Sequence, residues 1–207
     1  MPDDELIGRI GKRLLQVPEV IDPMGLEPDW VPDIPFHEPP VPAAVLIALL
    51  RRPAGLTVLY TARSSGLRAH SGQVAFPGGK IDPTDDGPGA AALREAREEV
   101  DLDPREVTII GYMPPYRTGT NYLITPVVAT ATPTKPFVAN PAEVDAAFEV
   151  PLGWLVDEKS YGTFRIKRDG VEHTTWELHH GGFRIWGITA NLTRRFRDLA
   201  LNGEEPW

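Results

Sequence analysis

The sequence contains no cysteine, which excludes disulfide bonds, cysteine nucleophiles, cysteine-ligated zinc and iron–sulfur clusters. It also lacks a long apolar run. The longest, Val41 to Leu50, is shorter than the roughly 20 residues of a membrane-spanning helix and is interrupted by Pro42. Basic residues are in deficit, with 21 Lys and Arg against 29 Asp and Glu and a formal net charge of −8. This balance argues against non-specific nucleic-acid binding, in which cationic side chains displace counterions.

What is present is the composition of a globular protein. The chain has 207 residues, 42% of them hydrophobic, enough for one domain with a sizeable core. Its first residues, MPDDELIGR, are acidic where a signal peptide would have a basic and then an apolar segment. We therefore expect a soluble cytoplasmic protein with neither nucleic acid nor membrane as a partner.

The N-terminal region changes character at residue 18. Residues 3–15 have acids at their start and apolar residues at every fourth position, which predicts a short amphipathic helix. Eight prolines follow between residues 18 and 42, a density that forbids regular structure. We expect residues 1–42 to be a helix and a proline-rich arm packed on a domain of residues 43–202, with a tail at 203–207.

Strand and helix patterns alternate through that domain. Apolar runs bounded by turn residues predict strands at 43–50, 56–61, 107–111, 122–130, 163–167, 171–178 and 183–186. Helical periodicity predicts helices at 88–100 and 188–201 and a short one near 152–156. Asp169-Gly170 is a strong signal for a two-residue turn. Together these elements indicate an α/β or α+β domain with a mixed sheet.

The helix predicted at 88–100 carries three carboxylates within one turn. At about 100° per residue, Glu95, Glu98 and Glu99 lie roughly opposite the apolar Leu93 and Val100. Carboxylates this close repel one another, and hard divalent cations, which prefer oxygen ligands, reverse that repulsion. An acidic run alone is more often a solvated helix face, so a metal site needs further support from neighbouring residues.

That support comes from the residues around the acidic run. Arg94 precedes Glu98 by four positions and can hold its carboxylate in a fixed orientation. Upstream, Gly78 and Gly79 form a turn where the backbone can approach a ligand or a metal closely.

Together these residues resemble the Nudix hydrolase signature, G-x5-E-x7-R-E-U-x-E-E-x-G-U, in which U is a bulky aliphatic residue. The matching positions are Gly79, Arg94, Glu95, Glu98, Glu99 and Leu102.

The sequence departs from that signature in three places. The segment between Gly79 and Arg94 has 14 residues instead of 13. Asp85 or Asp86 must substitute for the first Glu, and Asp101 replaces the penultimate Gly, with Ala96 as a small residue at a bulky position.

A second resemblance is more specific. Residues 59–64, then Arg68, Gly72 and residues 76–79 follow the pattern LLTxRSx3Rx3GxxxFPGG, with Tyr60 as the single mismatch. This pattern marks the coenzyme A pyrophosphatase branch of the Nudix family. Further similarity downstream extends the resemblance over roughly residues 43–200.

The resemblance implies a fold and a reaction. The family fold is an α/β/α sandwich with a mixed β-sheet. The branch implies hydrolysis of the pyrophosphate bond of CoA or acyl-CoA, giving 3′,5′-ADP and the (acyl-)4′-phosphopantetheine part, with Mg²⁺ or Mn²⁺ as cofactor. A homodimer contact or a lid over the substrate would give the proline-rich arm a use.

Roles for individual residues follow from this resemblance and from the helix geometry. The expected metal ligands are Glu95, Glu98, Glu99 and the backbone carbonyl of Gly79. Arg94 is expected to orient the carboxylates. The general base remains open between Glu98 and Glu143.

Substrate contacts are expected just before the helix. Arg63 and Arg68 flank a loop rich in Ser and Gly and could each hold a phosphate of CoA bidentately, with a surface ion pair as the alternative for either. Gly78 and Lys80 complete the expected substrate contacts.

Two alternative functions stay open. One is a Nudix pyrophosphatase acting on another nucleoside diphosphate derivative, such as a nucleotide or a dinucleotide. The other is a non-catalytic Nudix binding module. The pattern from Arg63 to Gly79 speaks against the first alternative, and the intact carboxylates at Glu95, Glu98 and Glu99 speak against the second.

Overall fold

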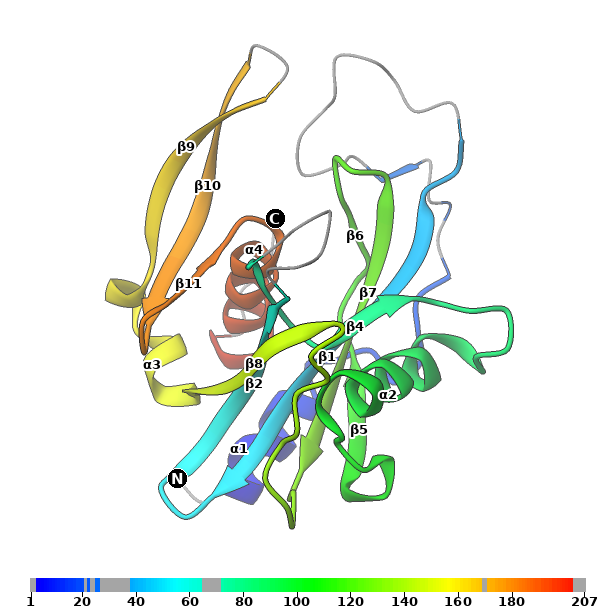
Figure 1. Ribbon diagram of the computed structural model, residues 1–207, viewed down its shortest axis with the longest axis vertical. Coiled ribbons are helices and arrows are strands. Elements are labelled where there is room, and N and C mark those ends of the chain that lie inside the picture. The colour runs from blue at the N-terminus through cyan, green and yellow to red at the C-terminus, as the bar shows by residue number, and fades with distance from the viewer. Residues whose placement is uncertain are drawn as a thin grey trace.

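A computed structural model describes residues 3–20, 22, 25–26, 38–64, 72–168 and 171–202 (Figure 1). In chain order its elements are α1 (Asp3–Gly11), β1 (Val41–Arg52), β2 (Gly55–Arg63), β3 (Val74–Ala75), β4 (Gly78–Lys80), α2 (Gly87–Val100), η2 (Pro104–Glu106), β5 (Val107–Tyr112), β6 (Tyr116–Arg117), β7 (Tyr122–Ala131), β8 (Val144–Pro151), α3 (Leu152–Val156), η3 (Glu158–Ser160), β9 (Gly162–Arg168), β10 (Val171–His180), β11 (Phe183–Trp186), α4 (Ile188–Phe196) and the π-helical η4 (Arg197–Asn202).

The main sheet is mixed and has β1 at its centre. Its strand order is β3-β2-β1-β7-β5, with β4 paired to β1, β6 to β7 and β8 to β2. The pair β1–β7 is parallel from Val41↔Tyr122 to Leu50↔Ala131, and the other pairs of this sheet are antiparallel. On its other side β1 pairs first with β4 and then, near its end, with β2. This change of partner at β1 is where the candidate site lies.

Alternate residues of β1 enter two different cores. Ala44, Leu46 and Ala48 pack with the buried alanines of α2, whereas Ala43 and Ile47 belong to the core that includes residues of α1, α3 and α4. Because successive side chains of a strand point to opposite faces, the sheet lies between two helical layers. The expected α/β/α sandwich with a mixed sheet, of α+β type, is confirmed.

A smaller sheet, in the order β11-β10-β9, stands beside the main one, and its β9–β10 hairpin extends away from the rest of the molecule (Figure 1). Stacked aromatic rings connect the two sheets. The ring centroid of Phe148 in β8 lies 3.9 Å from that of Phe183 in β11 and 5.7 Å from that of Tyr60 in β2. The base of the hairpin also contacts α4, where Arg194 lies 3.8 Å above the Trp176 ring.

The strands predicted from the sequence are all present, and several are longer than expected. The strand β8 was not predicted, because its sequence VDAAFEVP mixes Ala and acids with few β-branched residues. The short strands β3, β4 and β6 were not predicted either, since two or three residues carry no recognisable period. The turn Asp169-Gly170 lies outside the described residues.

Two predicted helices end earlier than expected. The helix predicted at 3–15 stops at Gly11, and Leu15 instead forms an antiparallel bridge with Tyr112 of β5. The helix predicted at 188–201 becomes π-helical after Phe196. Ile10 of α1 is fully buried, and the Arg13 side chain donates to the carbonyl of Leu201 at 2.9 Å, so α1 packs on the domain. Most of residues 21–37 and the predicted tail at 203–207 lie outside the described residues.

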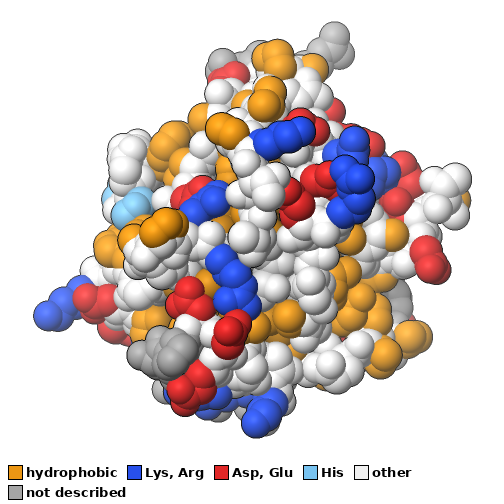
Figure 2. Space-filling model, turned by 90° about the horizontal axis from the view of Figure 1, so that it is seen from below, with side chains coloured by type: hydrophobic (Ala, Val, Ile, Leu, Met, Phe, Trp, Pro, Cys, Tyr) orange, Lys and Arg blue, Asp and Glu red, His pale blue; other side chains and the backbone are white. Residues whose placement is uncertain are grey.

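No helix in the described part of the chain is long and apolar enough to cross a membrane. Figure 2 shows one face of the molecule, over which acidic and basic side chains are intermixed. Elsewhere in the described residues, too, acids and bases are neighbours: a side-chain nitrogen of Arg52 lies 2.8 Å from an oxygen of Glu149, and one of Arg51 lies 2.7 Å from an oxygen of Asp4. The acidic excess of the sequence is therefore not gathered on that face.

Candidate active site

The helix α2 carries the first part of the site. Ala92, Ala96 and Val100 are fully buried against the sheet, which fixes the rotation of the helix about its axis. Glu95 and Glu99, four residues apart, then lie on the side of α2 that contacts β4. The helix ends at Asp101, whose φ of 55° is left-handed. Asp tolerates this conformation better than most residues, which explains how it replaces the Gly of the signature.

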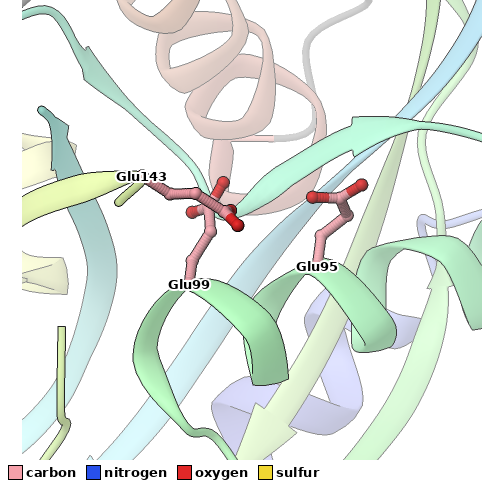
Figure 3. A group of neighbouring side chains, drawn as sticks. All are labelled: Glu95, Glu99 and Glu143. Carbon is pink, nitrogen blue, oxygen red and sulfur yellow. The ribbon is translucent and has the colours of Figure 1, made fainter. Parts of the chain in front are cut away.

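Three carboxylates meet beside this helix. Glu95 and Glu99 come from successive turns of α2, and Glu143 reaches them from the segment before β8 (Figure 3). One oxygen of each carboxylate lies within 4.8 Å of the other two.

Glu99 is the most deeply placed of the three, with 3% of its surface exposed. Its carboxylate accepts the backbone N–H of Gly78 and, at 3.3 Å, the hydroxyl of Thr61. Burial, and next the negative charge of Glu95, raise the pKa of Glu99 to about 8. Burial also raises the pKa of Glu95. Holding both groups ionised here therefore costs free energy, and a cation between them would recover it.

The two glycines of β4 lie in close contacts, Gly78 with the backbone of β1 and Gly79 with the side chain of Glu95. A Cβ at Gly79 would lie 2.6 Å from Cδ of Glu95, and one at Gly78 would lie 2.7 Å from Cα of Val45. Both distances are shorter than real Cβ contacts. The expected close approach of the backbone at this turn is thus present, and what it approaches is Glu95. The metal contact of the Gly79 carbonyl stays a prediction.

Arg94 is surrounded by acceptors. Its Nε and Nη2 donate to the two oxygens of Asp85 at 3.1 and 2.9 Å, and Nη2 also donates to the carbonyl of Lys80 at 3.1 Å. Its Nη1 donates to Glu95 at 2.9 Å and to Glu98 at 3.2 Å. The bidentate partner lowers the pKa of Asp85. Of the two candidates for the first acidic position, Asp85 is therefore the one that pairs with Arg94, while Asp86 is exposed.

Glu98 lies apart from the three grouped carboxylates. Its side chain is 48% exposed, and its carboxylate accepts a hydrogen bond from Arg94 at 3.2 Å. The spacing of the acidic run placed Glu98 beside Glu95 and Glu99, but it could not show which side of the helix meets the sheet. A ligand role for Glu98 remains a prediction without support from this geometry, whereas Glu143, from a distant segment, occupies the third place in the group.

A pocket of about 360 Å³, which we call the α4 pocket, is bordered by Gly78 and Gly79, the residues that contact Glu99 and Glu95. It lies between β1 and β7 on one side and the first turns of α4 on the other. Arg63, Gly78, Gly79 and Lys80 line it, so three of the four expected substrate-binding residues border one cavity. The fourth, Arg68, lies outside the described residues. In the described part of the chain, the buried Nε of Arg63 has no hydrogen-bond partner.

Sequence reasoning did not identify several residues of this site. Thr61 contacts Glu99, and Tyr122, Ile188, Thr189 and Leu192 line the α4 pocket. They are ordinary residues of strands and of a helix, and their role arises only when distant segments meet.

Comparison with known proteins gives three findings. Residues 40–168 match the family model of the NUDIX domain. A protein named "Uncharacterized Nudix hydrolase NudL" from Escherichia fergusonii is 46% identical over 166 residues, covering 79% of this chain and 84% of that protein, and the protein of the same name from Escherichia coli K12 gives the same values. The solved structure of a Nudix hydrolase from M. smegmatis, RenU, is similar with a TM-score of 0.47 and 24% identity, covering 56% of this chain and 73% of that one.

Proposed function

The chain belongs to the NUDIX domain family and is a Nudix hydrolase, and from this premise we propose that it hydrolyses the pyrophosphate bond of coenzyme A and its acyl derivatives. The products would be 3′,5′-ADP and 4′-phosphopantetheine or its acylated form. The observation that carries the proposal is the contact between the Gly78–Gly79 segment, which ends the CoA pyrophosphatase pattern, and the carboxylates of Glu95 and Glu99.

Glu95, Glu99 and Glu143 are the proposed ligands of a divalent cation. Their oxygens lie within 4.8 Å of one another, a spacing that small side-chain rotations bring to the requirements of Mg²⁺ or Mn²⁺. The donor set is all oxygen, as these hard cations prefer. Burial raises the pKa of Glu99 even though the charge of Arg63 lowers it, so a cation here would reduce the cost of ionising the group, and the residues fit such an ion.

A divalent cation supplies charge neutralisation on the pyrophosphate and makes water a better nucleophile. The side chains around it would hold and orient the substrate. Arg63 and Lys80 border the Gly78–Gly79 segment and are the proposed partners of the phosphoryl oxygens, with the unpaired Nε of Arg63 as one donor. A water oxygen forms a bond to one phosphorus while the bridging P–O bond breaks, and each half leaves with one phosphate.

Glu143 is our choice for the general base that takes the proton of the attacking water. It lies in the carboxylate group and comes from a different segment than α2, and its two oxygens allow one to bind the cation while the other takes the proton. Glu98 is the other candidate, but its exposed carboxylate is held by Arg94. We propose that Arg94, paired with Asp85, is a positioning residue that orients Glu95.

The test is incubation of the purified protein with CoA and Mg²⁺ or Mn²⁺ at neutral and alkaline pH, with the products separated by chromatography. The proposal predicts 3′,5′-ADP and 4′-phosphopantetheine in equal amounts, and neither without metal. Absence of 3′,5′-ADP with both metals at both pH values would overturn the CoA assignment. In that event a panel of nucleoside triphosphates and dinucleotides identifies the Nudix substrate instead.

A further inference from the structure

Tyr60 of β2 is the single mismatch to the coenzyme A pyrophosphatase pattern, which has a leucine at this position. Its side chain is fully buried. The next residue of β2, Thr61, contacts Glu99, and successive side chains of a strand point to opposite faces, so Tyr60 points to the face covered by α4. Tyr60 therefore lies between the strand that supports Glu99 and the helix that forms one wall of the α4 pocket.

The hydroxyl of Tyr60 joins β2 to α4 by a hydrogen bond whose direction is fixed. It lies 3.0 Å from Oγ1 of the buried Thr193. Thr193 has one hydroxyl hydrogen and donates it to the carbonyl of Thr189 at 2.8 Å, so the hydrogen between the two side chains comes from Tyr60. Burial raises the pKa of Tyr60, which keeps this hydrogen on its oxygen. A leucine, as in the pattern, could not donate it, so the bond is a feature of this chain.

Thr189 extends the connection to the segment that leads into β4. Its own hydroxyl donates to the carbonyl of Val74 in β3 at 2.8 Å. Val74 stands shortly before Gly78 in the chain, and Thr189 lines the α4 pocket together with Ile188 and Leu192. The wall of the pocket that α4 provides is therefore tied by side-chain hydrogen bonds to both β2 and β3.

The ring of Tyr60 supports the same segment by packing. It stacks on the ring of Phe76, with the two centroids 4.7 Å apart and the planes inclined by 28°. Phe76 is buried, lines the α4 pocket and is separated by one residue from Gly78–Gly79, the segment that contacts Glu95 and Glu99. The position of Tyr60 thus bears on the pocket wall and on the backbone beside the carboxylates.

Resting on the proposed function, we propose that Tyr60 is a positioning residue, whose hydroxyl and ring hold the α4 wall of the pocket at a fixed distance from the Gly78–Gly79 segment. CoA then meets a preformed pocket, and less binding free energy is lost in ordering it. Without the hydroxyl, α4 is held less firmly to β2 while Thr61 still contacts Glu99. Such a change weakens the binding of substrate and transition state alike, which raises KM and leaves kcat unchanged.

The first experiment is Tyr60→Phe, which keeps the ring and removes the hydroxyl. We expect the KM for CoA to rise roughly threefold to tenfold, the scale of one hydrogen bond, with kcat changed by less than about twofold. The matched control is Tyr161→Phe, because the hydroxyl of Tyr161 donates to the carbonyl of Leu155 at 2.9 Å and neither residue is among the described residues that line the α4 pocket. A merely structural role predicts lower stability for both variants and a higher KM for neither. An unchanged KM in Tyr60→Phe, or an equal rise in both variants, would overturn the inference.

A double-variant cycle tests whether the two hydroxyls form one connection. Thr193→Val keeps the shape of the side chain and removes the acceptor of the Tyr60 hydroxyl, so it should also raise the KM for CoA. Because the two partners share one hydrogen bond, KM in the double variant should be no higher than in the more affected single variant. Increases in KM that multiply in the double variant would contradict a shared connection.

Hydrogen exchange distinguishes this inference from the proposed function, since it requires no turnover. In Tyr60→Phe the backbone amides of residues 188–196 should exchange faster than in the parent and in Tyr161→Phe. If CoA is hydrolysed and Tyr60→Phe changes neither KM nor exchange, the inference is wrong and the proposed function stands. If CoA is not hydrolysed but exchange in this helix rises, the proposed function is wrong and Tyr60 still holds the wall of the pocket in place.

Discussion

Two groups of acidic side chains lie on and beside the helix α2, and they differ in their compensation. Asp85 is paired bidentately with Arg94, and the pKa of its carboxyl is lowered. Glu99 is buried near Glu95 and Glu143, and its pKa is raised to about 8. The charge of Asp85 is compensated within the chain by Arg94, and we expect this pair to stabilise the fold. In the second group Arg94 also donates to Glu95, yet the pKa of Glu99 stays raised, and we propose that a bound cation supplies the remaining compensation.

The largest expected effect on activity comes from substituting Glu99, the buried carboxylate with the raised pKa. Glu99→Gln keeps the shape of the side chain and removes a proposed metal ligand. We expect kcat on CoA to fall about a thousandfold, since a metal supplies several kcal/mol of charge stabilisation. Steady-state kinetics with saturating Mg²⁺ measures it. If this variant turns over CoA at the parent rate, the metal assignment is wrong.

The next prediction distinguishes Glu143 from Glu98 as the general base. Glu143→Gln is expected to lower kcat by about a hundredfold, the lower range for loss of a general base. Glu98→Gln, at an exposed position outside the carboxylate group, should lower kcat by less than about tenfold, the scale of a residue acting through Arg94. The pH profiles of kcat for both variants give the comparison. The reverse order of the two losses would assign the base to Glu98.

Breaking the ion pair between Arg94 and Asp85 should lower the stability of the fold. Asp85→Asn removes a charged partner from Arg94 and should cost roughly 1–3 kcal/mol in the free energy of unfolding. Since about 2–4 °C of Tm corresponds to each kcal/mol at this chain length, thermal unfolding of the metal-free protein will detect it. Asp86→Asn is the matched control, because that side chain is exposed and makes no capping hydrogen bond. Equal Tm values for the two variants would show that the Arg94–Asp85 pair does not stabilise the fold.

A further expected effect concerns pH. Between about pH 5 and pH 8 the unfolded chain loses the Glu99 proton while the metal-free folded protein keeps it, so the free energy of unfolding falls as pH rises through this window. Relative to Glu99→Gln, the Tm of the metal-free parent should therefore fall by roughly 3–6 °C for each pH unit within this window, since one pKa unit corresponds to ~1.4 kcal/mol. Added Mg²⁺ should restore the parent at the upper end. Parallel Tm curves for parent and variant would refute the raised pKa.

The layers of the fold could be predicted from the sequence, as could the part of the site formed by Glu95, Glu99 and Gly79. The i,i+4 spacing of Glu95 and Glu99 predicted their common side of α2, and Gly79 predicted a close approach of the backbone. Helical spacing also grouped Glu98 with them, because periodicity gives angles between residues and not the position of the neighbouring sheet. The place of Glu143 depends on β8, a strand that was not predicted. Contacts between distant segments, including those that form the α4 pocket, could not be predicted without the fold itself.

The most direct test of the central claim is a calorimetric titration of the metal-free protein with Mn²⁺, for the parent and for Glu99→Gln. The account predicts that the parent binds Mn²⁺ and releases protons at about neutral pH, because the carboxylate of Glu99 must ionise to bind. It also predicts that Glu99→Gln binds at least about tenfold more weakly, the scale on which even the residues supporting metal ligands affect affinity. Equal affinities, with no proton release from the parent, would contradict a cation site at Glu95, Glu99 and Glu143.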